Sequence, residues 1–347
     1  MDLQSFYNGK TILVTGGVGS IGSYLVREIL KYDPHSIRVF DNNETGLFDL
    51  EQDLSSEKLR SFIGDIRDKE RLMMAMEGVD IVFHAAALKH VPLCEFNPFD
   101  AVKTNVIGTQ NVLDAAFSQG VKKVITISTD KAVNPSNVMG ATKLLAERLT
   151  ISANSYKGNK KIAFSCVRFG NVLNSRGSVI PLFFRQIRKG GPLTVTHKEM
   201  RRFFMDIPSA AHLILTAGME SNGDEIFILK MPALRIMDLA EEMRDIIAPR
   251  YGLDPKKIDI TVIGMRCGEK IDEVLMSIDE TSCIFENDEM YISVPSHVAY
   301  ANNAPAREVP PGFRPAQVRS FSSENARLIT REEIRSIITN LNISCDT

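Results

Sequence analysis

The residues best suited to proton transfer lie together at the end of a predicted strand. The segment 123–128 (KVITIS) is a short apolar run that predicts a buried strand. Thr129, Asp130 and Lys131 follow it directly. A carboxyl group and an amine can act as acid and base if their surroundings shift their proton affinities. The alternative is an ion pair that caps the strand, and the residues alone favour that interpretation.

A glycine triplet is the second feature with a clear chemical meaning. Gly16, Gly19 and Gly22 form GxxGxxG between a predicted strand at 10–15 and a helical pattern that ends near residue 31. Glycine at these positions allows a tight turn and close approach of the backbone to a pyrophosphate. The helix N-terminus then offers N–H groups to the phosphates. This context predicts a dinucleotide site, and the alternative is a tight turn without a ligand.

Two acidic residues at strand ends bear on the choice of dinucleotide. Asp41 ends the second predicted strand, where an acid accepts hydrogen bonds from the adenosine ribose and repels a 2′-phosphate. Asn42 and Asn43 follow it and bring no positive charge, so we expect NAD rather than NADP. Asp65 follows the third predicted strand, where it fits a place near the adenine or a purely structural turn.

Strands and helices alternate along the first half of the chain. Continuous apolar strands separated by helices are typical of a parallel sheet covered on both faces, with the ligand crevice at the carboxyl ends of the strands. We therefore predict an α/β protein with a Rossmann-type, doubly wound parallel sheet and a smaller mixed α/β C-terminal substrate domain. The predicted strands are 10–15, 36–40, 59–63, 80–84, 123–128 and 162–169.

After Asn171 the alternation loosens. Thr330 and Glu333 have the spacing of a capping box, so the last helix is expected to begin near Thr330. We expect a dinucleotide-binding domain over 1–172, a substrate domain over 173–300 with segments returning to the first domain, and a Pro-rich linker with a C-terminal helix over 301–347. Within 173–300 the predicted strands are 192–196, 225–229 and 259–263, and the predicted helices are 207–219 and 237–247.

The composition excludes several classes of protein. A length of 347 residues suggests two domains at about 150 residues each. A hydrophobic content of 44% and a charged content of 24% exclude a disordered or fibrous chain. The net charge of −2 offers no overall attraction to nucleic acid or to an anionic membrane. No apolar run approaches the length of a membrane span, so we expect neither nucleic acid nor membrane as a partner.

The cysteines and histidines show no pattern of a metal site or a disulfide framework. The five cysteines form no CxxC pair, and their number is odd. No His/Cys cluster has metal-ligand spacing, and there is no GxSxG nucleophile elbow. The pattern suits a reducing compartment, and with no signal sequence at the N-terminus we expect a cytoplasmic protein without a bound metal.

Several longer motifs resemble those of the extended short-chain dehydrogenase/reductase family, and within it the nucleotide-sugar 4,6-dehydratases that act on UDP-N-acetylglucosamine. The resemblance runs from about residue 10 to residue 277, and it is to the short soluble forms rather than to relatives with an N-terminal membrane region. Arg201 departs from the pattern, because relatives more often have Thr there. The motifs are TGGVGSIG at 15–22, HAAALKHVP at 84–92, STDKAVNPSNVMGATK at 128–143, RFGNVLNSRGSVIP at 168–181, RRFFM at 201–205 and GMRCGEKIDEVL at 264–275.

Short-chain dehydrogenases place a Tyr and a Lys four residues apart on one helix, with the Tyr as acid/base and the Lys on the nicotinamide ribose. In this chain Lys143 matches the Lys, and Met139 stands in place of the Tyr. A thioether cannot move protons, so the C4 hydroxyl proton needs another acceptor. The hypothesis is that Asp130, or a water held by Thr129, takes it.

The resemblance implies a redox-neutral dehydration that uses NAD. Hydride leaves sugar C4, the resulting ketone acidifies the C5 proton, water is lost across C5 and C6, and the hydride returns to C6. Lys131 is expected to be the C5 base and Asp130 the C6 acid. Lys131 needs burial or nearby positive charge to act as a base, and Lys143 is a neighbouring cation.

The resemblance also implies two sets of binding residues. The substrate carries a negatively charged pyrophosphate, for which arginine is the best-suited side chain. Glu273 is expected to hold the uridine ribose or to brace an arginine. The expected cofactor-binding residues are Gly16, Gly19, Ser20, Ile21, Gly22, Asp41, Asp65, Ile66, Ala85 and Lys143. The expected substrate-binding residues are Lys89, His90, Asn171, Arg176, Ser178, Val179, Arg202, Arg266 and Glu273.

Three other functions remain open from the sequence. A 4,6-dehydratase either retains or inverts the configuration at C5, and overall likeness favours retention. A UDP-sugar C4 epimerase would normally need the Tyr that Met139 replaces. A non-catalytic NAD-binding regulator would show this same loss, but it would not need the intact Thr129-Asp130-Lys131 segment. Relatives self-associate through helices of the dinucleotide-binding domain, so a homo-oligomer is expected.

Overall fold

The computed structural model describes residues 2–173, 175, 177–280, 283–294, 309–318 and 320–341. The chain divides into two compact units, and it passes between them several times. Unit 1 comprises Met1–Phe169, Pro208–Lys230 and Leu275–Ser320, and unit 2 comprises Gly170–Ile207, Met231–Val274 and Phe321–Thr347.

In the described residues, unit 1 is built on a ten-stranded sheet with the order β16-β14-β15-β10-β6-β5-β4-β1-β2-β3. The strands from β3 to β10 are parallel, and β15, β14 and β16 continue the sheet with antiparallel pairing. Their bounds are β1 Thr11–Thr15, β2 Ser36–Asp41, β3 Leu59–Ile63, β4 Ile81–His84, β5 Lys123–Thr129, β6 Ala163–Phe169, β10 Ile226–Leu229, β14 Ile284–Glu286, β15 Met290–Ser293 and β16 Arg314–Pro315.

The prediction of a Rossmann-type, doubly wound parallel sheet is confirmed. All six strands predicted in the first half of the chain are present. The central strands β1, β4, β5 and β6 are almost wholly buried, because helices cover both of their faces, whereas the edge strand β3 is largely exposed. The run predicted at 225–229 forms β10, which lies parallel to β6 in this same sheet. It is therefore one of the segments by which the chain returns to unit 1.

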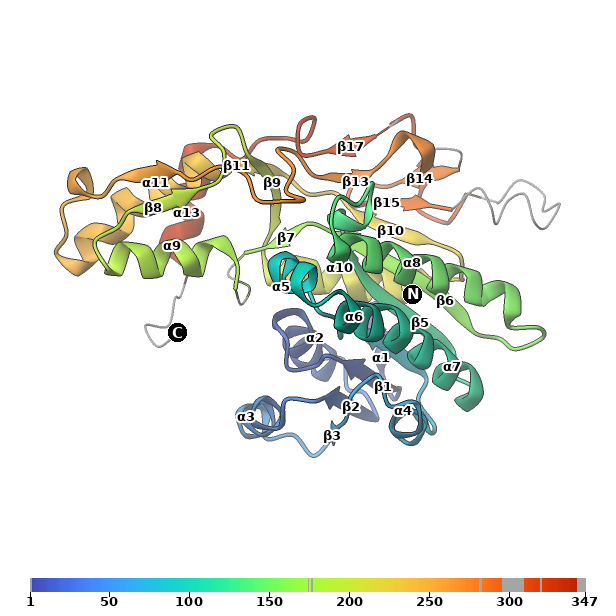
Figure 1. Ribbon diagram of the computed structural model, residues 1–347. Helices are drawn as coiled ribbons and strands as arrows, with labels where there is room; N and C mark the ends of the chain where they lie inside the picture. The colour runs from blue at the N-terminus through green and yellow to red at the C-terminus, as the bar shows by residue number, and fades with distance from the viewer. Residues whose placement is uncertain are drawn as a thin grey trace. The chain divides into compact units, whose positions relative to one another are not determined.

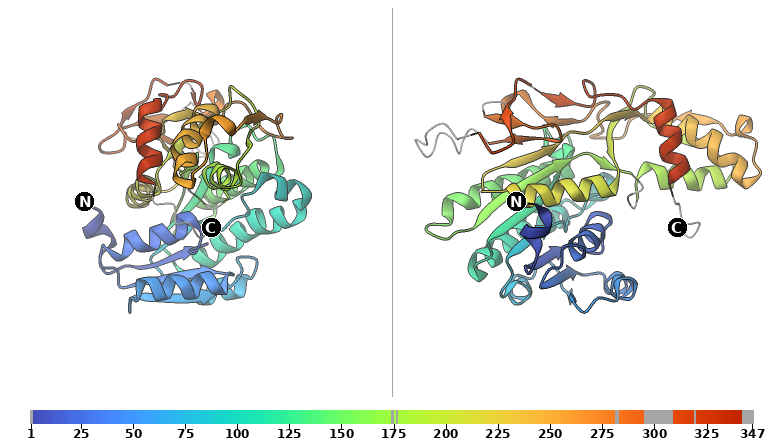
Figure 2. Two further views of the ribbon diagram at one scale, coloured as in Figure 1. Left: turned by 90° about the vertical axis from the view of Figure 1, so that its left-hand side faces the viewer. Right: turned by 180° about the vertical axis from the view of Figure 1, so that it is seen from behind.

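Helices cover both faces of this sheet. In Figure 1, α7 and α8 lie in front of the strands, and the view from behind in Figure 2 shows α10 over the opposite face. The Tyr7 hydroxyl at the end of α1 donates to the Leu215 carbonyl of α10 at 2.7 Å, so these two helices share a face. The helices of unit 1 are α1 Leu3–Tyr7, α2 Ser20–Leu30, α3 Glu44–Leu54, α4 Lys69–Met76, α5 Val91–Phe96, α6 Pro98–Val102, the π-helix η1 Lys103–Gly108, α7 Thr109–Gln119, the 3-10 turn η2 Asp130–Ala132, α8 Val138–Tyr156, α10 Ile207–Glu220 and the 3-10 turn η5 Ile278–Glu280.

Unit 2 is a smaller mixed α/β unit with its own apolar core. Strand β9 pairs parallel with β7 and antiparallel with β11, and β8 pairs parallel with β12. The capping box at Thr330 and Glu333 is present, and Ile334 and Ile338 of this last helix are buried in the core. The elements are β7 Asn171–Val172, α9 Val179–Arg188, β8 Leu193–Val195, β9 Arg201–Met205, β11 Ala233–Arg235, α11 Ile236–Ile247, η3 Ala248–Tyr251, η4 Pro255–Lys257, β12 Ile260–Val262, β13 Val274–Met276 (at the boundary with unit 1), β17 Phe321–Ser322 and α13 Arg331–Asn340.

A buried histidine links the strands of unit 1 to the helices that follow them. His84 ends β4, and its Nδ1 lies 2.7 Å from the Thr15 hydroxyl at the end of β1. Its Nε2 lies 3.0 Å from the Thr109 hydroxyl, which donates its own proton to the Asn105 carbonyl. His84 must therefore be the donor to Thr109, which makes it a neutral ring protonated on Nε2. Burial, followed by the charge of Lys143, lowers the pKa of His84 to about 3.

This histidine makes the stability of unit 1 depend on pH. Because its pKa is about 3 in the folded chain and 6.5 in the unfolded chain, the unfolded state binds the extra proton first as the pH falls. The contribution is intact above pH 6.5 and is lost between pH 6.5 and pH 3, with about 2 kcal/mol lost at pH 5. We expect the difference in unfolding free energy between wild type and His84→Asn to shrink by about this amount from pH 7.5 to pH 5.

Urea unfolding at the two pH values measures the effect. His212→Asn, on the exposed side of α10, is the matched control and should give the same difference from wild type at both. A His84→Asn difference that does not change with pH would show that folding does not lower the pKa of His84.

Candidate active site

Three loops meet at the carboxyl edge of the sheet in unit 1. The amide of Ala85, just after β4, donates to the Thr15 carbonyl of β1 at 3.1 Å. Gly16 follows β1 with φ +67°, and a Cβ on it would lie 2.6 Å from the Ala86 nitrogen. The loops after β1 and β4 therefore touch through backbone atoms. This is the point where the strand order reverses, which is where α/β sheets of this kind bind ligands.

The three glycines of the GxxGxxG pattern have different structural roles. A Cβ on Gly22 would lie 2.2 Å from the Gly16 carbonyl oxygen, so glycine is required there for α2 to pack on the loop. A Cβ on Gly19 would meet no atom closer than 3.2 Å, and its φ of −68° is open to any residue. The fold alone therefore does not demand glycine at position 19. Glycine would be required at position 19 if a ligand came close to the N-terminus of α2.

Asp41 and Asp65 are both held by neighbouring donors. The Asp41 carboxylate accepts from the Val18 amide at 3.2 Å and the Asn43 amide at 3.0 Å, which ties the end of β2 to the glycine loop. Arg67 forms a forked contact with Asp65, its Nη2 lying 2.6 Å from the carboxylate, and it lowers the Asp65 pKa. Both carboxylates are thus held in place at the ends of their strands, Asp41 against the glycine loop and Asp65 by Arg67.

The remaining residues expected at the cofactor lie close to this loop or under it. Ser20 and Ile21 form the first turn of α2 and are half-buried, as is Ala85. Ile66 is 4% exposed and belongs to the core beneath, where it packs on Gly108. The structure therefore gives Ile66 a packing role of its own.

The Thr129-Asp130-Lys131 segment turns sharply at the end of β5. Asp130 is fully buried, and its Oδ1 accepts from the Thr129 hydroxyl at 2.8 Å and from Lys131 Nζ at 3.0 Å. Its other oxygen, Oδ2, is buried and has no hydrogen-bond partner among the described residues. The buried Ser128 hydroxyl is in the same situation, and the sequence analysis overlooked it. Buried polar atoms without partners are what a site that receives a polar ligand provides.

Met139 and Lys143 lie on the buried side of α8. Met139 is 4% exposed and packs against Cys94 and Ala101, so it has a place in a small apolar cluster. Lys143 Nζ donates to the Ile127 carbonyl of β5 at 2.6 Å. Burial lowers the pKa of Lys143, and the Glu147 carboxylate one turn further along opposes this effect.

The start of α8 is fixed by contacts that the sequence did not reveal. The Asn137 side chain accepts from the Gly140 amide at 2.8 Å, and Glu95 of α5 accepts from the Val138 amide at 2.6 Å. A Cβ on Gly140 would lie 2.3 Å from the Lys131 carbonyl oxygen. Glycine at 140 therefore lets the helix that carries Lys143 press against the turn that carries Lys131.

Lys89 and His90 are exposed on the loop between β4 and α5. Burial of part of the ring, followed by the charge of Lys89, lowers the pKa of His90. The loop begins at the same carboxyl edge as the glycine loop, since it follows Ala85.

The residues expected to bind substrate in the second half of the chain belong to unit 2 and form a group of their own. Arg202 is 6% exposed, and its guanidinium donates to the Ile271 carbonyl at 3.0 Å and the Lys270 carbonyl at 2.8 Å. Glu273 Oε1 lies 3.7 Å from Arg202 Nε, which is the bracing contact anticipated for it. In this arrangement Arg202 holds the segment 270–273 against β9.

Arg201, the departure from the family pattern, has a similar structural role. Its guanidinium forms a two-point contact with Asp272 at 2.7 and 2.9 Å. The Ser323 hydroxyl donates to the same carboxylate at 2.9 Å. Arg201, next to Arg202 on β9, therefore also binds the segment 270–273 of unit 2.

The other expected substrate contacts are spread along unit 2. Ser178 is the N-cap residue of α9, yet its side chain makes no capping bond, and its buried hydroxyl has no partner among the described residues. Val179 begins α9, Asn171 begins β7, and Arg266 has an exposed side chain. Arg176 lies outside the described residues.

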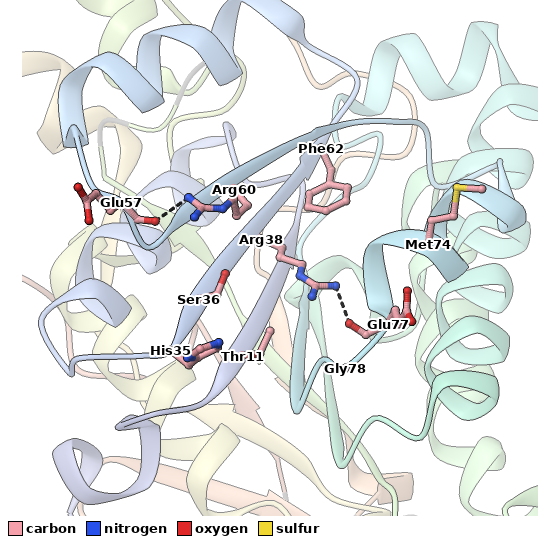
Figure 3. A pocket seen from close by; sticks show the side chains of 10 residues that line it. All are labelled: Thr11, His35, Ser36, Arg38, Glu57, Arg60, Phe62, Met74, Glu77 and Gly78. Carbon is pink, nitrogen blue, oxygen red and sulfur yellow. Dashed lines mark hydrogen bonds between the residues drawn. The ribbon is translucent and has the colours of Figure 1, made fainter.

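A cavity of about 720 Å³ lies away from this edge. Figure 3 shows that Arg38 points into it and that its guanidinium bonds the Glu77 carbonyl, at the end of α4. Thr11 and Ser36, which also line it, begin β1 and β2, so the cavity lies at the amino ends of the strands. It is therefore at the opposite edge of the sheet from Asp130 and Lys143.

The described residues contain no group of three or more His, Cys, Asp or Glu side chains arranged to hold a metal ion. Nor do they contain a helix long and apolar enough to cross a membrane.

A family model described as polysaccharide biosynthesis protein matches residues 12–295. The chain belongs to this family. It is 56% identical over 337 residues to an uncharacterized membrane protein of Methanocaldococcus jannaschii, and the alignment covers 97% of each chain. It is 43% identical over 292 residues to an inverting UDP-N-acetylglucosamine 4,6-dehydratase of Campylobacter jejuni, covering 84% of each. It is also 39% identical over 338 residues to a UDP-glucose 4-epimerase of Rickettsia rickettsii, covering 96% of each.

Solved structures agree with this membership. Pen from Bacillus thuringiensis superposes with a TM-score of 0.88 at 42% identity, over 98% of this chain and all of that one. A dTDP-glucose 4,6-dehydratase from Streptomyces venezuelae, solved with NAD, shares the fold with a TM-score of 0.66 at 24% identity, over 75% of this chain and 86% of that one. This polysaccharide biosynthesis family member is thus an enzyme of the nucleotide-sugar dehydratase and epimerase kind.

Proposed function

We propose that this enzyme is a 4,6-dehydratase that oxidises C4 of UDP-N-acetylglucosamine, eliminates water across C5 and C6 and reduces C6, using tightly bound NAD, to give a UDP-2-acetamido-2,6-dideoxy-4-hexulose. The observation that carries the proposal is the buried Asp130 carboxylate, paired with Lys131 on one oxygen and without a partner on the other. Two proton-handling groups at one strand end suit a dehydration. Met139, in place of the usual Tyr, argues against a simple oxidoreductase.

The cofactor site fits NAD. Gly16 and Gly22 bring the loop and α2 together so closely that a Cβ on either would overlap backbone atoms, which leaves a cradle for a pyrophosphate. The Asp41 carboxylate beside the loop suits ribose hydroxyls and would repel a 2′-phosphate. Lys143 would donate to the nicotinamide ribose. When bound, NAD supplies the hydride acceptor for sugar C4 and, once reduced, the hydride donor for C6.

Asp130 and Lys131 would handle the protons in sequence. Asp130 Oδ2 accepts the C4 hydroxyl proton as hydride leaves C4, or receives it through a water held by Thr129. Lys131 Nζ then removes the C5 proton made acidic by the ketone. Asp130 returns its proton to the C6 hydroxyl, which departs as water, and Lys131 returns a proton to C5 as hydride reaches C6. The net change is the loss of one water.

The ion pair and the catalytic role are compatible. While Asp130 is ionised, its contact with Lys131 at 3.0 Å favours the charged amine, which cannot act as a base. Once Asp130 accepts the C4 proton, its negative charge is gone, and the Lys131 ammonium, 23% exposed, releases its own proton to solvent water more readily. It takes a proton back from water when the cycle closes and Asp130 is ionised again. Oxidation at C4 would thereby prepare the base for the step at C5.

Substrate phosphates are assigned to unit 2, and the dinucleotide to unit 1. The uncapped N-terminus of α9, with the partnerless Ser178 hydroxyl and the Val179 amide, suits a pyrophosphate. Asn171, Arg176 and Arg266 are proposed to add donors. Lys89 and His90 are proposed to contact the sugar from the loop after β4.

A UDP-sugar C4 epimerase is the second proposal, because a relative named as an epimerase covers nearly the whole chain. Such an enzyme would act at C4 alone and would leave the C6 hydroxyl in place. The location is proposed to be the cytoplasm, because an odd number of cysteines with no CxxC pair suits a reducing compartment.

The glycine loop gives a test of cofactor binding that separates fold from ligand. We expect Gly22→Ala to lower both Tm and NAD affinity, because its Cβ would overlap the Gly16 carbonyl. Gly19→Ala should change Tm little, because the protein atom nearest to its Cβ would be the Gly16 carbonyl oxygen at 3.2 Å. It should weaken NAD binding by about tenfold or more, because the Cβ would stand where the ligand approaches α2. Calorimetric titration and thermal unfolding measure the two effects. Full NAD affinity in Gly19→Ala would place the pyrophosphate elsewhere.

The reaction is tested by incubating the protein with UDP-N-acetylglucosamine in deuterated water, without added cofactor. We expect a product lighter by one water, with deuterium at C5, by mass spectrometry and proton NMR. The C5 couplings read the configuration, for which overall likeness favours retention while the Campylobacter relative is named as inverting. Loss of C4 configuration without loss of water would establish the epimerase instead, and unchanged substrate would favour the regulator.

Single variants separate the two proton-handling roles. Asp130→Asn should prevent formation of reduced nicotinamide, because the C4 proton has no acceptor. Lys131→Ala should permit it but lower turnover by about a hundredfold or more. Lys122→Ala, an exposed lysine before β5, is the matched control and should keep normal turnover. Near-normal turnover in Asp130→Asn or Lys131→Ala would refute the assignment.

Self-association is proposed through unit 1, where α5 and α6 expose large apolar side chains. Leu93, Phe96 and Phe99 are 62%, 86% and 81% exposed. We expect the protein to sediment as an oligomer and the double variant Phe96→Ser, Phe99→Ser to sediment as a smaller species. An unchanged sedimentation coefficient would exclude this surface.

A further inference from the structure

Two buried charged side chains and one partly buried one form a connected group that begins one helical turn after Lys143. Glu147 of α8 and Arg168 of β6 are each 1% exposed, and Arg168 Nε and Nη2 donate to the two Glu147 oxygens at 3.0 and 2.7 Å. The other side of the guanidinium donates to the two Glu280 oxygens at 3.0 and 2.9 Å, and Nη1 also reaches the Leu275 carbonyl at 2.8 Å. One arginine therefore joins two carboxylates in two-point contacts.

This group carries one negative charge in excess. Two carboxylates meet one guanidinium, and both oxygens of each carboxylate accept N–H bonds, which is the geometry of ionised groups. Burial alone would raise the pKa of Glu280, but Arg168 lowers it below its ordinary value. Burial opposes the charge of Arg168, yet Glu147 and Glu280 raise its pKa. Arg148 of α8 also lowers the pKa of Glu280, but its side chain is exposed and screened by solvent. An uncompensated buried charge is costly, so a cation inside the protein is still needed nearby.

Lys143 is the cation in that position. It lies one helical turn before Glu147, on the same buried side of α8. The other groups around it offer no net charge: His84 of β4 is neutral, Cys166 of β6 has its pKa raised by burial, and Ile127 of β5 contributes a carbonyl. On η2, Asp130 and Lys131 neutralise each other.

We propose that the Glu147–Arg168–Glu280 group is the counter-charge that keeps the buried Lys143 protonated, which makes Glu147 and Glu280 positioning residues for the cofactor. The part that concerns the cofactor rests on the proposed function, since it takes NAD as the ligand of Lys143. The electrostatic part does not depend on any ligand. An ammonium has three donors and a charge to offer ribose oxygens, whereas a neutral amine has lost the charge and one donor.

Glu280→Gln is the decisive variant, because it keeps the shape of the side chain and removes one charge. Because the Glu280 side chain is 17% exposed, we expect Glu280→Gln to fold. Glu147 is fully buried, and we expect Glu147→Gln to be unfolded. The matched control is Glu286→Gln, which removes a carboxylate of 16% exposure that pairs with Lys230, on another part of the same sheet.

The first measurement is Tm against pH in the absence of ligands. Without the counter-charge, the pKa of Lys143 falls further below its unfolded value of 10.5. The destabilisation that comes from Lys143 is full at neutral pH and is lost as the pH rises through the folded pKa of this lysine. The loss of the Arg168–Glu280 ion pair leaves a smaller deficit that does not change over this range. We expect Glu280→Gln to lower Tm by about 5 °C near neutral pH. The deficit should shrink by pH 9.5, and adding Lys143→Met should restore part of the lost Tm at neutral pH.

The second measurement is NAD affinity against pH, where the expected trend is opposite. At low pH, Lys143 of Glu280→Gln is still protonated and binding should match wild type. As the pH rises to 9, the lysine loses its proton, and binding should weaken by about tenfold relative to wild type, the worth of a charged hydrogen bond. Glu286→Gln should follow wild type at every pH.

The outcomes distinguish this inference from the proposed function. A Tm deficit in Glu280→Gln that is constant with pH and unaffected by Lys143→Met would overturn the inference, whatever the protein binds. Wild type that fails to bind NAD would overturn the proposed cofactor, while the Tm measurements would still decide the electrostatic part. NAD affinity of Glu280→Gln that parallels wild type from pH 6 to pH 9 would show that Lys143 keeps its proton without the group.

Discussion

The need to hold a positive charge inside the protein constrains much of unit 1. Lys143 is 7% exposed and lies against a strand carbonyl, where water cannot solvate its ammonium. The ion pairs of Arg168 with Glu147 and Glu280 place two carboxylates and one guanidinium on the same helix, the adjoining strand β6 and the turn η5. The fold also keeps the neighbouring His84 neutral, since a second cation there would compete for the same counter-charge. Strands β5 and β6, helix α8 and turn η5 are thereby tied to one electrostatic requirement.

Backbone contacts provide the second constraint, because they decide how closely the loops can meet. Gly16 faces the loop after β4, Gly22 faces the glycine loop itself, and Gly140 faces the turn that carries Lys131. In each case a Cβ would overlap backbone atoms, which cannot move aside as a flexible side chain can. The glycine loop and the turn that carries Lys131, which we propose as the dinucleotide site and the site of proton transfer, thus share one feature. In each, a glycine on a helix or loop allows a neighbouring main chain to approach closely.

The replacement of the usual Tyr by Met139 becomes intelligible in this setting. The Met139 thioether packs against Cys94 and Ala101 in a small apolar cluster, so the side chain at this position has a packing role. In the proposed mechanism the acid and base functions lie at the strand end, where Asp130 has one oxygen engaged and one without a partner among the described residues. A carboxylate that can both accept and return a proton suits a reaction in which one proton leaves C4 and another is needed at C6.

The sequence by itself determined the parallel sheet, the glycine loop and the spacing of Lys143, because these depend on local patterns: apolar runs, a glycine triplet and a helical period. It also located the last helix through its capping box. It did not reveal that β10 extends the sheet of unit 1, since a short apolar run carries no record of which strand it pairs with. Nor did it show that Arg202 is occupied by the carbonyls of 270 and 271, because a surface arginine and a buried one look alike in a sequence. Glu147 is 21 residues from Arg168 along the chain, and Glu280 is 112 residues from it. Only the tertiary structure could bring them together, because the pairing of buried charges is settled by packing distance and not by sequence separation.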